Sequence, residues 1–444
     1  MNQNEPPPPS PAPWPALLAW ILGGVALLPV IVLHDAFARL FWFGDEWDLL
    51  EQIWRVGFWS WTWQAFAENF VPLFKLLWYG LVVAGNGDYR VMIAALWLTH
   101  AVNVALFGLL LRESGFGRVT ASGCMLVFGL TPTNLETLGW SVQWSAVLAT
   151  TFFLWAGWWQ MRHFSTDHRW HWRNHLVLFA LSAASALCFS RGVLTGAALA
   201  VIALWPVSRN WLHQAAPRLR TAAVCLAPGI AVAALIYLTQ PGGNHRQLGG
   251  ADRLLQMLEY AGWYFGMNPL HRLLHIDAWG WRTTTLIAAL KLALIGWCLW
   301  RSSGLTRRAL ALLLVWDLGN ALLLGLGRYH TGLETAHSSR YQYSSLLATL
   351  PFAAWWIDER VAKLTSSGWR FLRPALGAAL LLGVTLFVVR DWRSEADGFT
   401  QHRGHYTRHL LFHDPNPPAM GAVPGIGYLS TQRAKELIRR YNLH

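Results

Sequence analysis

Two adjacent carboxylates, Asp45 and Glu46, follow the first apolar segment of the chain within residues 43–48, which read FGDEWD. A membrane penalises charge, so carboxylates gathered where an apolar segment meets water need a reason. Such groups can take a proton from a hydroxyl, bind a divalent cation or hold a cationic partner. A structural explanation is equally open, because Asp45 suits a helix N-cap and the acidic residues up to Glu51 suit the positive end of a helix dipole.

A polar run between two later apolar segments is the second candidate. Residues 328–341 read RYHTGLETAHSSRY. Guanidinium groups bind phosphate through paired hydrogen bonds and stay charged, so Arg328 and Arg340, with His337 and Tyr341 nearby, are typical of an anion site. Arg and Tyr also anchor span ends at the membrane interface. The density of polar groups in this run favours the anion site.

Four polar residues elsewhere are further candidates for substrate binding. Glu136, Trp140 and Gln143 have helical spacings, which would place them on one face of a helix. A turn with a polar cap would also explain this stretch. Arg191 interrupts an apolar run and Lys75 lies in a short apolar segment, where a cation needs an anion or room to reach water. We predict that Glu136 and Gln143 line a substrate cavity. Arg191 and Lys75 are candidates for substrate binding, with a carboxylate, a phosphate or room to snorkel as the ways to satisfy their charge.

Several reaction classes lack their sequence signatures. No HExxH, Walker or GxGxxG motif occurs in a suitable context, which disfavours nucleotide hydrolysis and dinucleotide cofactors. The four Cys lie in apolar runs and indicate neither a disulfide framework nor a metal site. The net charge of +12 comes from basic residues spread over short loops, so no nucleic-acid partner is expected. No cofactor is required by these patterns, although the acidic pair leaves a divalent cation possible.

The composition is that of a polytopic membrane protein. Of 444 residues, 54% are hydrophobic and only 13% are charged, and the mean hydropathy is +0.30. The 29 Trp gather near the ends of apolar segments, as expected at a membrane interface. We therefore predict an all-α bundle of about eleven transmembrane spans. They lie near 14–34, 91–111, 119–138, 143–161, 175–190, 192–208, 221–239, 283–300, 308–326, 343–357 and 374–389.

Residues 71–85 form a shorter apolar stretch, which we interpret as a juxtamembrane helix in the first external loop, 35–90. Short cytoplasmic loops are enriched in Lys and Arg, and this assignment places the basic clusters together on the cytoplasmic side of the membrane. It predicts a disordered cytoplasmic leader at 1–13, a transmembrane domain at 14–389 and an external tail at 390–444. The candidate residues then lie at the outer face of a plasma membrane, where no nucleotide-activated donor is available.

The arrangement resembles the GT-C superfamily of integral membrane glycosyltransferases. The likeness consists of a first span, an external loop that opens with Asp45 and Glu46, and a helix that begins PLFK at residues 72–75. In the branches similar to protein mannosyltransferases and lipid A aminoarabinose transferases, that helix usually begins His-Pro-Pro-Leu, and the histidine is missing here. The chain looks closer to bacterial polytopic proteins with an Asp-Glu-Trp-Asp opening and a later Ser-Arg-Tyr, here residues 339–341.

The resemblance implies a polyprenyl-phosphate-linked sugar donor, used at the outer face of a bacterial inner membrane. An acidic residue of the first loop acts as base in such families, which implies this role for Asp45, with Glu46 as the adjacent candidate. A glycan or lipid of the cell envelope would be the acceptor. A single displacement, with arginines stabilising the departing phosphate, would invert the anomeric centre.

Two other functions fit many of the same residues. A transporter or flippase of lipid-linked glycans would also need many spans and a basic cavity, but the internal repeat or broken helices typical of transporters are not evident in the sequence. A polymerase or ligase of lipid-linked saccharides usually has a large late external loop, whereas the loop here is short. Convergence of Asp45, Arg191 and Arg340 on one cavity would favour the transferase, and wide separation would count against it.

Overall fold

The computed structural model describes residues 16–66, 69–164, 171–205, 215–239, 251–276, 280–365, 373–412, 425–427 and 429–444. Within these ranges the chain is helical, and the β-type pairing consists of an isolated bridge between Phe66 and Asn69. The predicted all-α class is confirmed for this part of the chain, and the leader at 1–13 lies outside it. The α-helices are α1 Ala16–Val25, α2 Leu28–Val32, α3 His34–Phe37, α4 Asp45–Val56, α5 Phe58–Trp63, α6 Pro72–Ala84, α7 Tyr89–Glu113, α8 Arg118–Leu130, α9 Leu135–Leu138, α10 Trp144–His163, α11 Trp172–Ala186, α12 Val193–Leu204, α13 Ala215–Thr239, α14 Ala251–Met267, α15 Leu270–Leu273, α16 Trp281–Arg301, α17 Gly304–Arg328, α18 Ser339–Thr365, α19 Arg373–Val389, α20 Trp392–Thr400, α21 Tyr406–Phe412 and α22 Thr431–Tyr441.

Long apolar helices identify a membrane protein. Among the described residues, four helices are long and apolar enough to cross a bilayer: Tyr89–Glu113, Ala215–Thr239, Trp281–Arg301 and Gly304–Thr331. Shorter apolar helices accompany them, at Ala16–Val32, Pro72–Ala84, Arg118–Leu130 and Ser190–Leu204. The structure thus supports a polytopic bundle, while the predicted number of about eleven spans stays a prediction.

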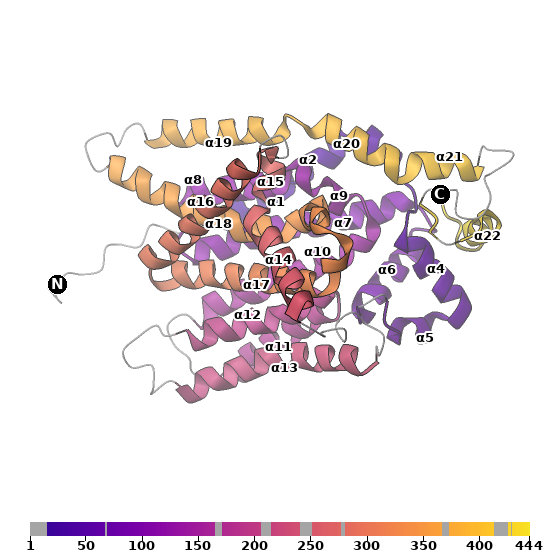
Figure 1. Cartoon of the computed structure of the whole chain (residues 1–444), viewed down its shortest axis with the longest axis horizontal. Helices are drawn as coiled ribbons and strands as arrows, with labels where there is room; N and C mark the ends of the chain where they lie inside the picture. The colour runs from indigo at the N-terminus through magenta and orange to yellow at the C-terminus, as the bar shows by residue number, and fades with distance from the viewer. Residues whose placement is uncertain are drawn as a thin grey trace.

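The long helices run side by side along the longest axis of the molecule (Figure 1). At the centre, α7 packs against α1, α8 and α10, and most of its side chains are buried. Further along the chain, α17 packs against α12, α14 and α18. Phe153 of α10 and Trp316 of α17 stack with ring centroids 4.2 Å apart, which joins these two groups of helices.

A lobe made of α4, α5 and α6 lies at one end of the bundle (Figure 1). The helix α4 is bounded by Gly44 and Gly57, whose φ angles of +59° and +80° suit glycine. Acidic residues in its first turn and Arg55 in its last turn match the helix dipole. The 13 residues of α6 are about 20 Å long, which is shorter than the hydrocarbon core. This lobe carries the acidic pair at its inner end.

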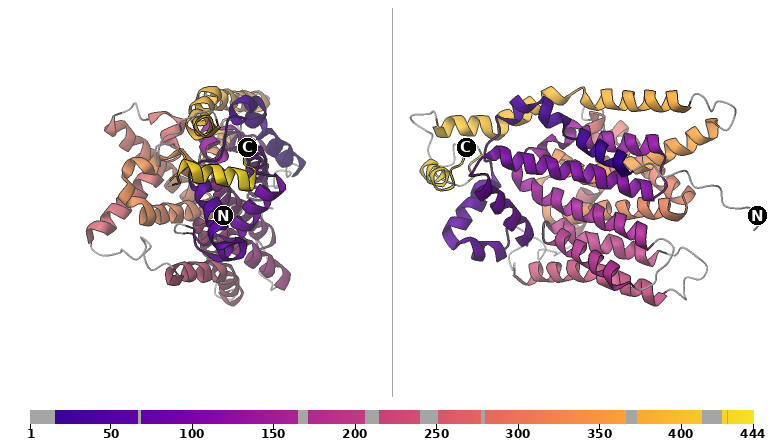
Figure 2. Two further views of the ribbon diagram at one scale, coloured as in Figure 1. Left: turned by 90° about the vertical axis from the view of Figure 1, so that its right-hand side faces the viewer. Right: turned by 180° about the vertical axis from the view of Figure 1, so that it is seen from behind.

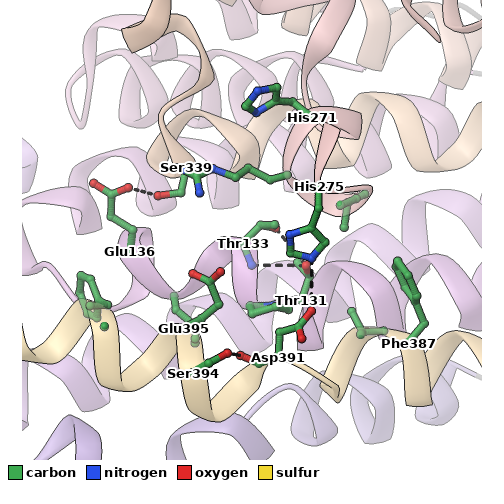
Figure 3. A pocket seen from close by; sticks show the side chains of 17 residues that line it. Thr131, Thr133, Glu136, His271, His275, Ser339, Phe387, Asp391, Ser394 and Glu395 are labelled. Atoms are coloured by element: carbon green, nitrogen blue, oxygen red, sulfur yellow. Dashed lines mark hydrogen bonds and ion pairs between the residues drawn. The ribbon is translucent and has the colours of Figure 1, made fainter. Parts of the chain in front are cut away.

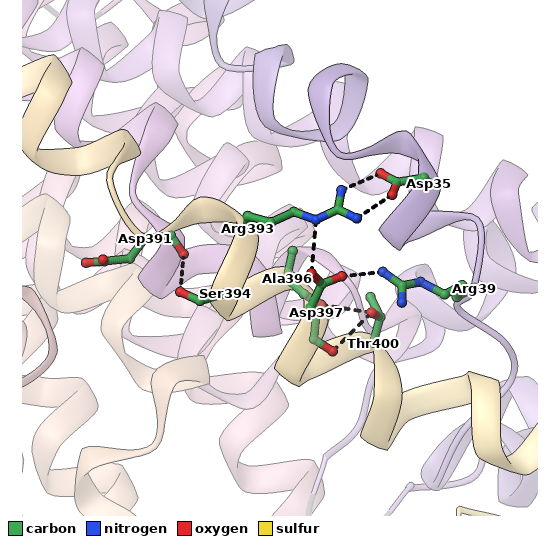
Figure 4. A network of polar contacts seen from close by, with 8 residues as sticks. All are labelled: Asp35, Arg39, Asp391, Arg393, Ser394, Ala396, Asp397 and Thr400. Carbon is green, nitrogen blue, oxygen red and sulfur yellow. Dashed lines mark hydrogen bonds and ion pairs between the residues drawn. The ribbon is translucent and has the colours of Figure 1, made fainter.

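The helix α20 of the tail is tied to the segment that precedes the lobe (Figure 4). Both Nη atoms of Arg393 donate to the carboxylate of Asp35, at 2.9 and 2.6 Å, and its Nε donates to Asp397 at 2.9 Å. Arg39 also forms a salt bridge with Asp397. These ion pairs are largely solvent-exposed, so each contributes little alone, but together they fix the position of α20.

The last helix, α22, packs on the lobe itself, as seen when the molecule is viewed from that end (Figure 2, left). The backbone N–H of Gly44 donates to the carbonyl of Gly425 at 2.6 Å, and that of Tyr89 donates to His444 at 3.1 Å. The tail therefore forms a backbone hydrogen bond to Gly44, the residue directly before Asp45.

Two parts of the predicted topology differ from the structure. The segment 240–282, predicted as a loop, contains α14 and α15, and α14 packs against α17. Its mixture of polar and apolar residues lacks the continuous hydropathy that marks a span. The span predicted at 119–138 is also wrong at its end, because α8 ends at Leu130 and a short 3₁₀ turn, η1, begins at Pro132.

Candidate active site

A cavity of about 170 Å³ lies where α4 meets the bundle. Its walls come from the start of α4 and α6, the start of α10, the turn before α12, the end of α17 and the start of α18. The six predicted site residues that line it are Asp45, Gln143, Arg191, Arg328, Arg340 and Tyr341. Segments far apart in the sequence thus bring one carboxylate and three guanidinium groups into a single cavity.

Asp45 is the first residue of α4 and its side chain remains accessible. The N-cap position of α4 is occupied by Gly44, so Asp45 is not the helix cap that the structural explanation assumed. Desolvation by the surrounding protein raises the pKa of Asp45, and the guanidinium groups of Arg340, Arg328 and Arg403 oppose that rise. A carboxylate with a raised pKa beside a cavity is suited to accept a proton.

Glu46 points away from the cavity and is fully buried. Its Oε1 accepts hydrogen bonds from the Tyr89 hydroxyl at 2.9 Å and from both the backbone N–H and the hydroxyl of Ser141, at 2.9 and 2.5 Å. Its Oε2 accepts from the backbone N–H of Phe43 at 2.7 Å. Burial raises the pKa of Glu46 to about 7, although these donors favour the ionised form. With its oxygens occupied, Glu46 joins the acidic helix to the bundle.

The three arginines that line the cavity carry positive charge that neighbouring carboxylates do not neutralise. In the described part of the chain, none of Arg191, Arg328 and Arg340 forms a salt bridge with a carboxylate. The Arg340 guanidinium lies 5.2 Å from the centroid of the Tyr341 ring. Three unpaired guanidinium groups and one carboxylate give this cavity the charge that an anionic ligand requires.

Arg191 is the most deeply placed of these cations and is only 4% exposed. Its Nη1 donates to the Ser344 hydroxyl at 2.9 Å, whereas its Nε has no partner. Ser344 also accepts from Asn320 at 3.1 Å, and the Tyr264 hydroxyl donates to Asp317 at 2.8 Å. Asp317 thus pairs with a neighbouring helix, and the network fixes Ser344 against Arg191. This buried Nε is a donor that an anion bound in the cavity would satisfy.

Lys75 lies outside the cavity lining and is fully buried. Its ammonium group donates to the backbone carbonyls of Trp61 and Gln64, at 2.7 and 2.8 Å, and lies 4.7 Å from the Trp61 ring centroid. These contacts join α5 to α6. The structure therefore places Lys75 in the framework of the lobe, away from the predicted phosphate.

Glu136, Trp140 and Gln143 do not share one helical face, and that prediction is wrong. The chain leaves α9 at Gly139 and re-enters a 3₁₀ turn, η2, at Ser141, so the helical spacing is interrupted. Gln143 and Trp140 line the cavity with Asp45, whereas Glu136 lies outside it and forms a salt bridge with Arg403.

His337 belongs to a neighbouring surface. Its ring centroid lies 4.0 Å from that of His271 and 5.5 Å from that of Trp263. His271 also lines a second cavity, of about 310 Å³, in which the hydroxyl of Ser339 donates to Glu136 and His275 lies 3.3 Å from Asp391 (Figure 3). His337 is thus separated from Arg340 and Tyr341, which lie in the first turn of α18, although all three belong to the polar run 328–341.

Two residues near Asp45, Arg403 and Asn69, were not predicted from the sequence to belong to this site. The Arg403 guanidinium, from the tail, lies 4.6 Å from the Trp140 ring centroid and acts electrostatically on Asp45. Asn69 lines the cavity, and its side-chain oxygen accepts from the backbone N–H of Ser190 at 3.2 Å. Among the described residues, no group of three or more His, Cys, Asp or Glu could hold a metal ion. We therefore assign no ligands to a divalent cation.

Comparison with known proteins gives a likeness in fold. No protein-family model and no curated protein sequence matches this chain. The chain is similar in structure to the oligosaccharyltransferase of Archaeoglobus fulgidus in its apo form, with a TM-score of 0.51 and 13% sequence identity. A structure of that enzyme, AglB, in complex with an inhibitory peptide and a dolichol-phosphate gives 0.50 and 14%. The structure tethered to an acceptor peptide that contains the NVT sequon gives 0.50 and 15%.

These alignments cover 90%, 90% and 97% of this chain, but only 58%, 58% and 59% of the archaeal chains. The chain therefore spans about three fifths of the length of the neighbours that it matches. At this level of identity the likeness shows a shared fold.

Proposed function

We propose that this protein is a membrane glycosyltransferase that moves a sugar from a polyprenyl-phosphate donor to a hydroxyl of a cell-envelope glycan or lipid. The observation that carries the proposal is the presence of Asp45 in one cavity with Arg191, Arg328 and Arg340. A proton acceptor beside an anion site is what glycosyl transfer from a phosphate requires. The fold shared with an oligosaccharyltransferase adds support.

The proposed reaction is a single displacement. The acceptor hydroxyl attacks the anomeric carbon, and its oxygen forms the new glycosidic bond while its proton passes to Asp45. The bond between the anomeric carbon and the phosphate oxygen breaks, and its electron pair leaves with the phosphate. Arg191, Arg328 and Arg340 stabilise the negative charge that develops there, and the anomeric centre is inverted.

Other lining residues have chemistry that suits the two remaining parts of the donor. Phe189, Leu323 and Leu324 give the cavity an apolar wall against which a polyprenyl chain can lie. Gln143 and Asn69 offer amide groups that can hydrogen-bond sugar hydroxyls. We place this site at the external face of a bacterial plasma membrane, where lipid-linked donors replace nucleotide sugars.

The proposal is tested with purified protein in proteoliposomes that contain labelled polyprenyl-phosphate hexoses and envelope lipids or glycans. The expected result is a covalent product with wild-type protein and with Arg360→Met, a control at an exposed residue near the opposite end of α18. Arg191→Met and Arg340→Met should each lose most of this product. Equal product from all four proteins would contradict the assigned phosphate site.

The same vesicles distinguish a flippase from a transferase. A flippase would move the labelled lipid-linked sugar between leaflets without forming a covalent product. That result would replace the proposed enzyme by the alternative transport function, for which a basic cavity is equally suitable.

A further inference from the structure

The second cavity lies between η1 (Pro132–Asn134), α15 and the junction of α19 with α20 (Figure 3). At about 310 Å³ it is large enough for part of a small ligand. Hydroxyl groups of Thr133, Ser339 and Ser394 line it together with the carboxylate of Glu395 and the imidazole of His275. This combination offers hydrogen-bond donors and acceptors on several sides.

The segment Ser339–Arg340 contributes to both this cavity and the one that contains Asp45. Ser339 lines the second cavity and the next residue, Arg340, lines the first. The hydroxyl of Ser339 donates to Glu136, which pairs with Arg403, and Arg403 in turn covers the Trp140 ring. A ligand in the second cavity would therefore lie next to the segment that carries the proposed phosphate-binding arginine.

The two cavities differ in charge. The first has three arginines without a carboxylate partner in the described part of the chain, which suits an anion. In the second, Glu136 is paired with Arg403, and Asp391 is bonded to Arg390 at 2.9 Å and lies 3.3 Å from His275. Arg272 and Glu395, one charge of each sign, also line the cavity. The charges of the lining thus balance, and its hydroxyl groups suit a neutral ligand rich in hydroxyl groups. The Phe399 ring, which also lines the cavity, offers an apolar surface to the C–H face of a sugar.

We propose that the second cavity binds the non-reacting part of the acceptor as a neutral saccharide, on the other side of the Ser339–Arg340 segment from the lipid-linked donor, while the reacting hydroxyl of the acceptor extends past this segment to Asp45. The role of this saccharide as the acceptor rests on the proposed function, whereas the binding of a saccharide to the cavity does not depend on it. Donor and acceptor are thereby assigned to cavities of opposite chemistry that share the Ser339–Arg340 segment.

A cysteine placed in the cavity gives a direct test. Ser394 is accessible and lines the cavity, and the four natural cysteines are all buried, so a thiol reagent applied to Ser394→Cys should modify that position alone. Gln401→Cys is a matched control, because Gln401 is exposed on the same tail and lies outside the cavity lining. The probes are neutral trisaccharides of glucose, mannose and N-acetylglucosamine, with inorganic phosphate as the anionic comparison.

At about ten times its dissociation constant, a trisaccharide that binds should slow modification of Ser394→Cys by roughly tenfold. It should leave Gln401→Cys unchanged, and phosphate should protect neither variant. If no trisaccharide slows modification at saturating concentration, or if both variants are protected equally, the saccharide site is overturned.

A second readout separates this inference from the proposed function. With a polyprenyl-phosphate hexose as donor, modified Ser394→Cys should lose transfer to a saccharide but retain the slow transfer of the sugar to water. Loss of both reactions would contradict a role confined to the acceptor. If the wild-type protein consumes no polyprenyl-phosphate sugar while a trisaccharide still protects Ser394→Cys, the proposed function fails and the saccharide site stands.

Discussion

Replacement of Glu46 by Gln tests whether this residue positions the acidic helix or takes part in chemistry. The carboxylate accepts four hydrogen bonds and donates none. In Glu46→Gln the amide oxygen can keep the three donors from Tyr89 and Ser141, so the amide nitrogen then faces the backbone N–H of Phe43. That contact places two donors against each other and leaves a buried N–H without an acceptor, which costs about 1–3 kcal/mol.

Such a cost should appear as easier opening of the lobe around α4. A change of about 1–3 kcal/mol corresponds to a loss of protection against hydrogen exchange of about 5- to 140-fold. The assay is hydrogen–deuterium exchange by mass spectrometry on peptides that cover 43–50 and 139–145. Glu436→Gln is the matched control, because Glu436 pairs with Arg433 within α22, which packs on the lobe, and its loss should change protection little.

The pH dependence of the same opening gives a second measurement. Burial raises the pKa of Glu46 from an ordinary 4.5 to about 7, so between these values the folded state binds more protons than the unfolded state. Its contribution to stability is therefore present below pH 4.5 and falls as the pH rises, by about 3 kcal/mol in total. Glu46→Gln should lack this dependence. Unchanged protection with lost transfer would refute the positioning role and assign Glu46 to the chemistry.

Three further predictions concern the cavity and the tail. Arg191→Met and Arg340→Met should each raise the KM for a polyprenyl-phosphate donor by about 10- to 100-fold, because each removes a charged hydrogen-bond donor, whereas Arg360→Met should not change it. Transfer should decline as the pH falls through the raised pKa of Asp45, and Arg340→Met should move this decline to higher pH, since the Arg340 guanidinium lowers that pKa. Arg433→Ala removes both a salt bridge to the lobe and a stacking contact 3.6 Å from a tryptophan ring centroid, so it should weaken the attachment of α22 by about 1–2 kcal/mol. The measurement is limited proteolysis, in which the tail should be cut faster while the helical bundle is cut at the wild-type rate.

The sequence identifies the side chains that line the main cavity better than those that support it. Asp45, Arg191 and Arg340 stand out because charge at the end of an apolar segment is costly, and that rule does not depend on tertiary contacts. The role of Glu46 depends on Ser141, which is 95 residues away in the chain. Lys75 follows the same charge rule, yet its ammonium group is satisfied by backbone carbonyls that the sequence cannot place.

The remaining differences have local causes. Glu136 and Gln143 have helical spacing, but Gly139 ends α9 between them, and the two side chains line different cavities. The helix α14 was not predicted because its apolar residues cover one face and leave the other polar, which gives no continuous apolar run. Arg403 lies in a tail without a recognisable motif, and it is connected with the site by its contact with Trp140 and its electrostatic effect on Asp45, neither of which the sequence shows.

The most direct test of the central claim is glycosyl transfer by Asp45→Asn in proteoliposomes with a polyprenyl-phosphate hexose. The variant keeps the size of the side chain and the three arginines, so it should bind the donor as wild-type protein does. It should lose nearly all transfer to the acceptor, because no group remains to take the hydroxyl proton. Wild-type rates of transfer by Asp45→Asn would contradict the assignment of Asp45 as the base.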